Sequence, residues 1–171
     1  MMFAKQILWL VAAIALVSVP RLRGADAVLV GIQQTWRYST NNVSALNWTA
    51  PDYDDSAWSS GPALLYIEDN PAVTPRNTTL PNRDGILPYV TYYFRTTFQL
   101  TAPPPSFLTF SNLVDDGAVF YLNGAEIYRL RIPPGPVGYT TFATTTPLGN
   151  DATSYEVFTI APTNLVIGTN V

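Results

Sequence analysis

The sequence contains no cysteine and no histidine among its 171 residues. Without cysteine, no disulfide can stabilise the fold, so the apolar core must suffice. Without histidine, the chain lacks the commonest general base and the commonest transition-metal ligand. These two absences exclude Ser-His-Asp catalysis, Cys-His catalysis and ordinary zinc sites.

The first 27 residues have the layout of a signal peptide. Lys5 precedes an apolar run from Ile7 to Val19, which is shorter than the ~20 residues that a membrane-spanning helix needs. Ala25, Asp26 and Ala27 place small residues where a signal peptidase reads the chain. We predict cleavage after Ala27, which leaves residues 28–171 as a secreted, periplasmic or extracellular domain without a membrane span.

An uncleaved membrane anchor is the alternative, because Arg21 and Arg23 follow the apolar run and Ala27 lies far beyond it. Cleavage removes these two arginines, Lys5 and Asp26 from the 9 basic and 12 acidic residues. The remainder has 6 basic and 11 acidic residues, a net charge of −5. Such a chain cannot form the basic stripe that phosphate backbones require, so we expect no nucleic-acid partner.

Fifteen prolines, ten glycines and many Thr, Tyr, Phe and Val residues favour short strands joined by turns. The alternation in Tyr92–Leu100 is typical of a strand with one buried face. The Asn123-Gly124 pair predicts a type I′ hairpin turn. No helical pattern competes, so we predict an all-β fold. The main predicted strands are Tyr92–Leu100, Ser106–Leu113, Ala118–Leu122, Glu126–Ile132, Tyr139–Thr145 and Ser154–Ile160.

The stretch from Glu68 to Pro88 is rich in proline and asparagine and has little periodicity. We interpret it as a long surface loop. Long loops without regular structure often carry function, so it is a candidate rim of a ligand site, and a plain connector is the alternative.

Three segments carry a family resemblance: Trp48–Trp58, Thr91–Phe98 and Asp115–Arg129. In this order they resemble the galactose-binding-domain-like jelly-roll modules of extracellular bacterial multidomain proteins. Relatives of these modules form the sugar-binding domain of β-galactosidase-type glycoside hydrolases. The resemblance implies an antiparallel jelly-roll β-sandwich, a fold that hosts carbohydrate binding, protein contacts and structural roles.

In such modules, the segment that resembles Asn164–Val171 leads into a final apolar strand, whereas this sequence stops at Val171. We therefore expect the final strand of the sandwich to be missing and the chain to be a fragment of a longer protein. A sandwich without that strand would expose unpaired backbone groups and an apolar groove.

Asp115 and Asp116 stand just before a predicted strand, where two carboxylates and backbone carbonyls could hold a structural calcium ion. The alternative is a tight turn in which aspartate oxygens accept backbone N–H groups and Gly117 supplies the positive φ. The spacing does not match a calcium loop with ligands at every second position. We expect no cofactor, although a structural calcium ion bound by Asp115 and Asp116 stays an open alternative.

Asp52, Asp54 and Asp55 lie between two tryptophans, and a pair of carboxylates can serve as the acid and base of a glycosidase. Adjacent carboxylates on an exposed turn rarely reach the separation that this chemistry needs. Turn formation is the other interpretation of this cluster, and we predict no catalytic residue.

Aromatic rings can stack on the C–H faces of sugars, or they can simply fill the core. We place Trp58 and Phe94 in the core. The candidate ligand-binding residues lie in turn-rich segments: Tyr53, Tyr66, Tyr89 and Tyr139.

The sequence thus predicts a secreted, non-catalytic binding module with carbohydrate as its ligand. The alternative is a structural or docking domain beside a larger extracellular enzyme or surface protein, with a neighbouring domain as its partner. A hydrolase in its own right is the third hypothesis.

Overall fold

The computed structural model describes residues 14–17, 27–67, 74–145 and 154–171. Within these ranges all regular structure is β, which confirms the all-β prediction. In the same part of the chain, no helix has the length and hydropathy needed to cross a membrane. The strands are β1 (Ile14–Val17), β2 (Ala27–Val28), β3 (Thr35–Ser39), β4 (Ser59–Pro62), β5 (Leu65–Tyr66), β6 (Thr78–Thr79), β7 (Tyr93–Arg95), β8 (Phe98–Leu100), β9 (Leu108–Asn112), β10 (Ala118–Leu122), β11 (Ala125–Leu130), β12 (Glu156–Ile160) and β13 (Gly168–Asn170).

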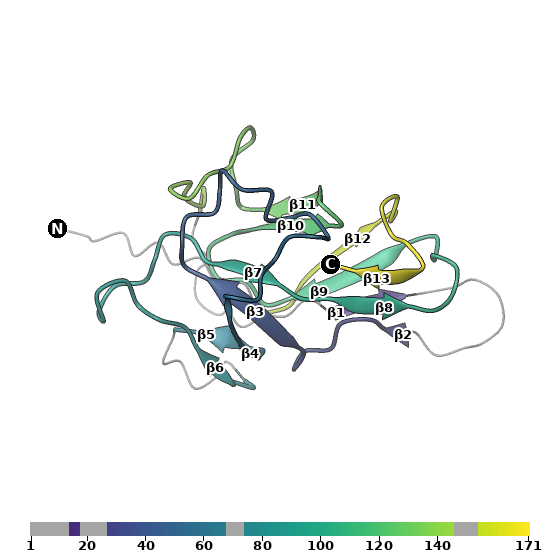
Figure 1. The fold of residues 1–171 in the computed structure, drawn as a ribbon, viewed down its shortest axis with the longest axis horizontal. Coiled ribbons are helices and arrows are strands. Elements are labelled where there is room, and N and C mark those ends of the chain that lie inside the picture. The colour runs from purple at the N-terminus through teal and green to yellow at the C-terminus, as the bar shows by residue number, and fades with distance from the viewer. Residues whose placement is uncertain (1–13, 18–26, 68–73, 146–153) are drawn as a thin grey trace.

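The strands form several small sheets (Figure 1). The largest has the order β12-β9-β1-β2, and a second has the order β4-β3-β7. Three pairs complete the described part of the fold: β10 with β11, β13 with β8, and β5 with β6. The β5–β6 pair is parallel, and the other pairs are antiparallel. The two-sheet jelly-roll arrangement is a finer statement, which stays a prediction.

The hairpin at Asn123-Gly124 is confirmed. Both residues have positive φ, at 48° and 88°, as a type I′ turn requires. Leu122 of β10 pairs with Ala125 of β11 directly across this turn. Local turn chemistry therefore sets the register next to the turn, and a β-bulge between Phe120 and Tyr121 shifts it further along the pair.

The predicted strand Tyr92–Leu100 is interrupted and has two buried faces at its start. It divides into β7 and β8, and Tyr93, Phe94 and Arg95 are all buried. The second face is covered because Trp48, from a distant loop, packs edge-on against Tyr93 with ring centroids 5.0 Å apart. The expectation of a single buried face was wrong for β7.

The predicted strand Tyr139–Thr145 does not form. A turn replaces it, in which the N–H of Thr141 donates to the carbonyl of Gly138 at 3.0 Å. The N–H of Gly138 donates in return to the hydroxyl of Thr141 at 2.9 Å. Threonine side chains that bond to nearby backbone compete with a strand ladder in this way.

The core consists of three apolar clusters. Phe94 belongs to the first and is 8% exposed, as predicted, whereas Trp58 is only half-buried. The buried members are Ala63, Leu64, Leu65, Leu80, Tyr92, Phe94 and Leu113 in the first cluster, Leu100, Leu108, Leu122 and Leu165 in the second, and Val114, Ala118, Phe120 and Phe158 in the third.

The N-terminal region contributes two strands to the largest sheet. β1 lies between β9 and β2 in this sheet, and β2 begins at Ala27 (Figure 1). The predicted cleavage point therefore falls within β2. Residues 1–13 and 18–26 of the predicted signal peptide lie outside the described residues, and its cleavage stays a prediction.

The turn before β10 uses Gly117 differently from the prediction. Asp116, not Gly117, has the positive φ, at 51°. A Cβ atom on residue 117 would lie 2.8 Å from the carbonyl oxygen of Leu130 and 2.9 Å from Cδ1 of Ile132. Glycine is needed here because the backbone of β11 approaches it closely.

We predict that Gly117→Ala lowers the free energy of unfolding by about 2 kcal/mol, the usual cost of overpacking a rigid site. Gly138→Ala is the matched control, because no atom lies within 4 Å of the position that its methyl group would take, and its φ is not positive. Urea denaturation of both variants measures the difference. Equal stability of the two variants would contradict the close approach at Gly117.

Candidate functional site

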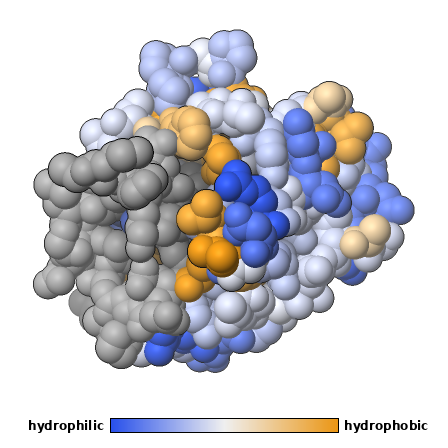
Figure 2. Space-filling model, turned by 90° about the vertical axis from the view of Figure 1, so that its left-hand side faces the viewer, coloured by the Kyte–Doolittle hydropathy of each residue, from blue (hydrophilic) through white to orange (hydrophobic). Residues whose placement is uncertain are grey.

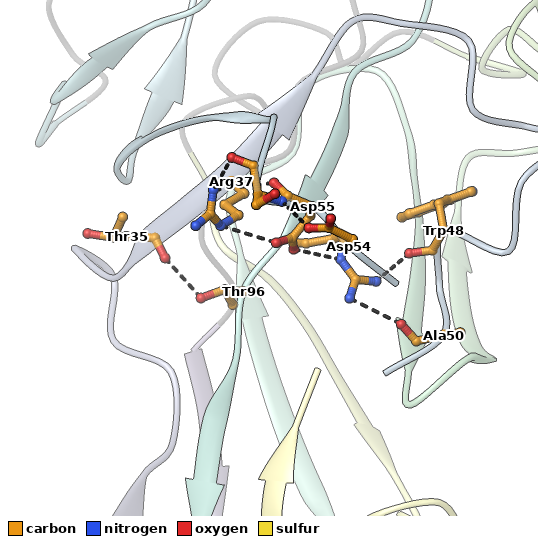
Figure 3. Close-up of polar contacts among 9 residues, drawn as sticks. Thr35, Arg37, Trp48, Ala50, Asp54, Asp55 and Thr96 are labelled. Carbon is orange, nitrogen blue, oxygen red and sulfur yellow. Dashed lines mark hydrogen bonds and ion pairs between the residues drawn. The ribbon is translucent and has the colours of Figure 1, made fainter. Parts of the chain in front are cut away.

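Arg95 of β7 binds the loop from Trp48 to Trp58 at three residues, Trp48, Ala50 and Asp55, which are labelled in Figure 3. Its side chain is only 5% exposed, and its Nε donates to Oδ2 of Asp55 at 2.9 Å. Its two terminal nitrogens donate to the carbonyls of Trp48 and Ala50. One buried guanidinium therefore binds three points of the same loop.

Asp55 lies between two guanidinium groups. Its second carboxylate oxygen is 3.1 Å from Nε of Arg37, which comes from β3. Arg37 also donates to the carbonyl of Ser56 at 3.2 Å. The Asp55 carboxylate thus connects the loop to two neighbouring strands.

Asp54 forms a turn with Ser56. Its Oδ1 accepts the N–H of Ser56 at 2.9 Å, and hydrogen bonds from the side chain and then the backbone of Ser56 hold the pKa of Asp54 below its ordinary value. A general acid needs the opposite shift. The contact of Asp54 with Ser56 matches the turn interpretation, whereas Asp55 pairs with two arginines, which that interpretation did not include.

An aromatic cluster surrounds this loop. The ring of Trp48 packs edge-on against Tyr93 and against Tyr121, with centroid distances of 5.0 and 5.4 Å. Tyr53 packs edge-on against Trp58 at 5.8 Å. The guanidinium carbon of Arg95 lies 5.4 Å from the centroid of the Tyr53 ring, within the range of a cation–π contact.

The four candidate tyrosines are all half-buried, and the structure does not bring all of them together. Tyr53 and Tyr139 join the aromatic cluster through Trp58 and Tyr93, since Tyr139 stacks on Tyr93 at 6.3 Å. The hydroxyl of Tyr139 donates to the carbonyl of Thr40 at 2.9 Å.

Tyr89 and Tyr66 have other neighbours. Tyr89 packs edge-on against Tyr92 at 5.8 Å, and an electrostatic interaction with Tyr89 adds to the effect of burial in raising the pKa of Tyr139. Tyr66 stands apart in β5, where Arg76 lies over its ring and its hydroxyl accepts from Thr79 at 3.0 Å. Among the candidates, Tyr53 alone lies in the loop that Arg95 holds.

A cavity of about 100 Å³ adjoins the cluster, and sequence reasoning did not find it. Its lining is mainly apolar and comes from segments far apart in the chain. The only signal in the sequence is the strand alternation of the lining residues. Prominent lining residues are Trp36, Trp48, Phe94, Phe98, Phe110 and Tyr121.

The Asp115–Asp116 turn is bound by an arginine. Arg131 donates to the carbonyls of Val114 and Asp116 and forms an ion pair with Glu156 at 2.5 Å. Oδ1 of Asp115 accepts the N–H of Asp116 at 3.0 Å, as the turn interpretation predicts. The described ranges hold no group of three carboxylates that could bind a metal ion, so calcium here stays a prediction with two candidate side chains.

The described part of the predicted rim loop contains β6, so it is not wholly irregular, and a hydrogen-bonded turn follows this strand. Oδ1 of Asp84 accepts the N–H groups of Ile86 and Leu87 at 3.1 and 2.8 Å. Ile86 is 80% exposed and Leu87 is 47% exposed. Figure 2 shows apolar residues beside hydrophilic ones on the side of the molecule that carries the β6–β7 connection. Residues 68–73 of this loop lie outside the described residues.

We predict that Asp55→Ala lowers the free energy of unfolding by about 3 kcal/mol, because Arg95 would stay buried without its anionic partner. Glu126→Ala is the control. It breaks the more exposed ion pair between Glu126 and Arg129, for which we expect a loss of about 1 kcal/mol or less. Chemical denaturation measures both, and equal losses would contradict the role of Asp55.

Tyr92 gives a prediction for alkaline pH. Burial raises the pKa of Tyr92 to about 12 from 10.0, and its hydroxyl donates to the carbonyl of Pro81 at 2.8 Å. The fold favours the neutral phenol, so this contribution to stability is complete below pH 10 and is lost as the pH rises to about 12.

The free energy of unfolding of Tyr92→Phe should therefore fall less steeply between pH 10 and 12 than that of the unaltered chain. Tyr155→Phe, at a residue that is 51% exposed, should keep the original slope. Denaturant titrations across this pH range provide the comparison. Parallel curves for all three proteins would show that Tyr92 does not couple folding to pH.

Comparisons with known proteins return no match. No family model matches the chain, no curated protein is significantly similar to it, and no solved structure has a significantly similar fold. The resemblance to galactose-binding-domain-like modules therefore rests on the three sequence segments alone.

Proposed function

We propose that the chain is a secreted, non-catalytic module of galactose-binding-domain-like fold that binds carbohydrate at the Trp48–Trp58 loop. The observation that carries this proposal is the pair formed by Tyr53 and Trp58, on a loop that Asp55 and Arg95 hold rigidly. A preorganised aromatic pair loses little conformational freedom when a ligand binds.

The polar groups of the loop complement the rings. Asp52 and Asp54 flank Tyr53 and are exposed. Asp54, whose pKa lies below its ordinary value, is ionised at neutral pH and can accept hydrogen bonds. A sugar presents C–H groups to an aromatic ring and hydroxyl donors to carboxylates, and this loop offers both within one turn.

The contacts of the carboxylates favour binding over hydrolysis. Asp55 is held in two ion pairs, and Asp54 is bound to Ser56. The pKa of Asp54 is lowered, which is the opposite of the shift that a proton donor in glycoside cleavage needs. Turnover of a polysaccharide that Asp54→Asn abolished would reverse this conclusion.

A docking or structural role in a larger extracellular protein is the second candidate. The apolar cavity beside Val171 favours it, together with the exposed side chains of Val166 and Ile167 just before β13. Apolar surface of this kind is usual where another protein segment packs.

We predict that Tyr53→Ala weakens polysaccharide binding about tenfold, which corresponds to the ~1.4 kcal/mol that an aromatic contact provides. Tyr66→Ala is the matched control, since Tyr66 is also half-buried and also lies under an arginine 5.4 Å away. Affinity electrophoresis in gels that contain galactans, xylans or glucans measures both variants.

Loss of binding in both variants would point to a general effect on the fold and contradict a site at Tyr53. Absence of binding by the unaltered protein at millimolar ligand concentrations would overturn the carbohydrate proposal and leave the docking role as the better candidate.

A further inference from the structure

β9 is paired on both edges in this structure. β12 occupies one edge, from Glu156 opposite Asn112 to Ile160 opposite Leu108. β1 occupies the other edge, with Ile14 opposite Ser111 and Val17 opposite Leu108 (Figure 1). The strand that covers this second edge comes from the segment that the sequence predicts to be removed.

Cleavage after Ala27 would open this edge. The alternate residues within 108–111 whose backbone N–H and C=O groups point away from β12 would then lack a ladder partner. Exposed strand edges are normally protected by lysine, proline or an inward-pointing charge. The sequence of β9 is Leu-Thr-Phe-Ser-Asn, which contains none of these.

β1, which occupies this edge of β9, shows what kind of strand the edge accepts. β1 has the sequence Ile-Ala-Leu-Val and runs antiparallel to β9. Two residues of β9, Leu108 and Phe110, also line the apolar cavity, so the edge adjoins apolar surface. A short apolar segment without proline therefore fits both the backbone ladder and its surroundings.

We infer that the β9 edge of the mature domain is an acceptor for an extended apolar strand donated by another polypeptide. The strand runs antiparallel to β9 and pairs with residues 108–111, a mode of recognition in which backbone hydrogen bonds give affinity and alternate side chains give specificity. This inference rests on the predicted cleavage after Ala27 and is independent of carbohydrate binding.

Disulfide trapping tests the register, because the chain has no cysteine of its own. The Thr109→Cys variant is purified in its secreted form. Mass spectrometry determines the N-terminus of this protein. Thr109 lies directly opposite Leu16, and cross-strand partners have Cβ atoms about 5 Å apart.

The probe is a synthetic peptide with the sequence of residues 12–19 and cysteine in place of Leu16. The control peptide carries cysteine in place of Ala15, which lies opposite Phe110. Each peptide is supplied as its mixed disulfide with glutathione, so that the thiolate of residue 109 attacks the peptide sulfur and glutathione leaves as the thiol. We expect the first peptide to become linked to the protein at least fivefold faster than the control. Equal rates for the two peptides would overturn a strand in this register.

Hydrogen exchange provides the second measurement. In secreted protein that begins at residue 28, the amides within 108–111 that point away from β12 should exchange at least tenfold more slowly after the cysteine-free peptide is added. The same peptide with proline in place of Leu16 should give no protection. If the mature domain does not fold alone, full-length Leu16→Pro should lose this protection and regain it with the peptide.

Three results would overturn the inference. The first is secreted protein that retains residues 14–17, and the second is protection, without any peptide, of the amides within 108–111 that point away from β12. The third is a second copy of the chain on this edge in a dimer. Polysaccharide binding is measured at Tyr53, which lies in the Trp48–Trp58 loop and not in β9. Failure of the strand acceptor therefore leaves the carbohydrate result unchanged, and the two outcomes can be told apart.

Discussion

The contact between Arg95 and the Trp48–Trp58 loop is the interaction on which the arrangement of the candidate site depends. A guanidinium that is 5% exposed cannot remain without partners, because a buried unpaired charge costs several kcal/mol. Asp55 and the carbonyls of Trp48 and Ala50 supply those partners. In the observed conformation the loop satisfies Arg95, and it places Tyr53 over the Arg95 guanidinium and beside Trp58.

Sequence reasoning found the parts of the fold that local chemistry determines. The β10–β11 hairpin was predictable because Asn123 and Gly124 tolerate the positive φ that its turn requires. The doubly buried β7 and the missing strand at 139–145 were not predictable in the same way. Trp48 covers β7 from a distant loop, and Tyr139 is held by Thr40 from 99 residues away. Only the tertiary structure shows such contacts.

The candidate site was partly predictable for the same reason. From the sequence, Tyr53 was a candidate binding residue, and the three aspartates of the same loop were interpreted as turn residues. The sequence did not show that Asp55 forms ion pairs with Arg37 and Arg95. Nor did it show that Tyr66 lies outside this loop, under Arg76. The cavity could not be predicted from the sequence, because residues from several strands meet there. Alternation shows which residues of one strand share a face, but it does not show which other strand lies opposite that face.

The chain has no disulfide, and its apolar core is divided into three clusters. Binding of a partner would therefore add to the stability of the fold. A domain without covalent cross-links gains stability from any partner that binds its folded form, by mass action. The cavity connects the two proposed surfaces, since Trp48 of the Arg95-held loop and Phe110 of β9 both line it. A strand on β9 would thus restrict one wall of the cavity, and Trp48, which packs on Tyr93, forms another. If the two proposed ligands affect each other, the coupling must be reciprocal, so a donated strand that strengthens carbohydrate binding would itself be bound more tightly in the presence of carbohydrate.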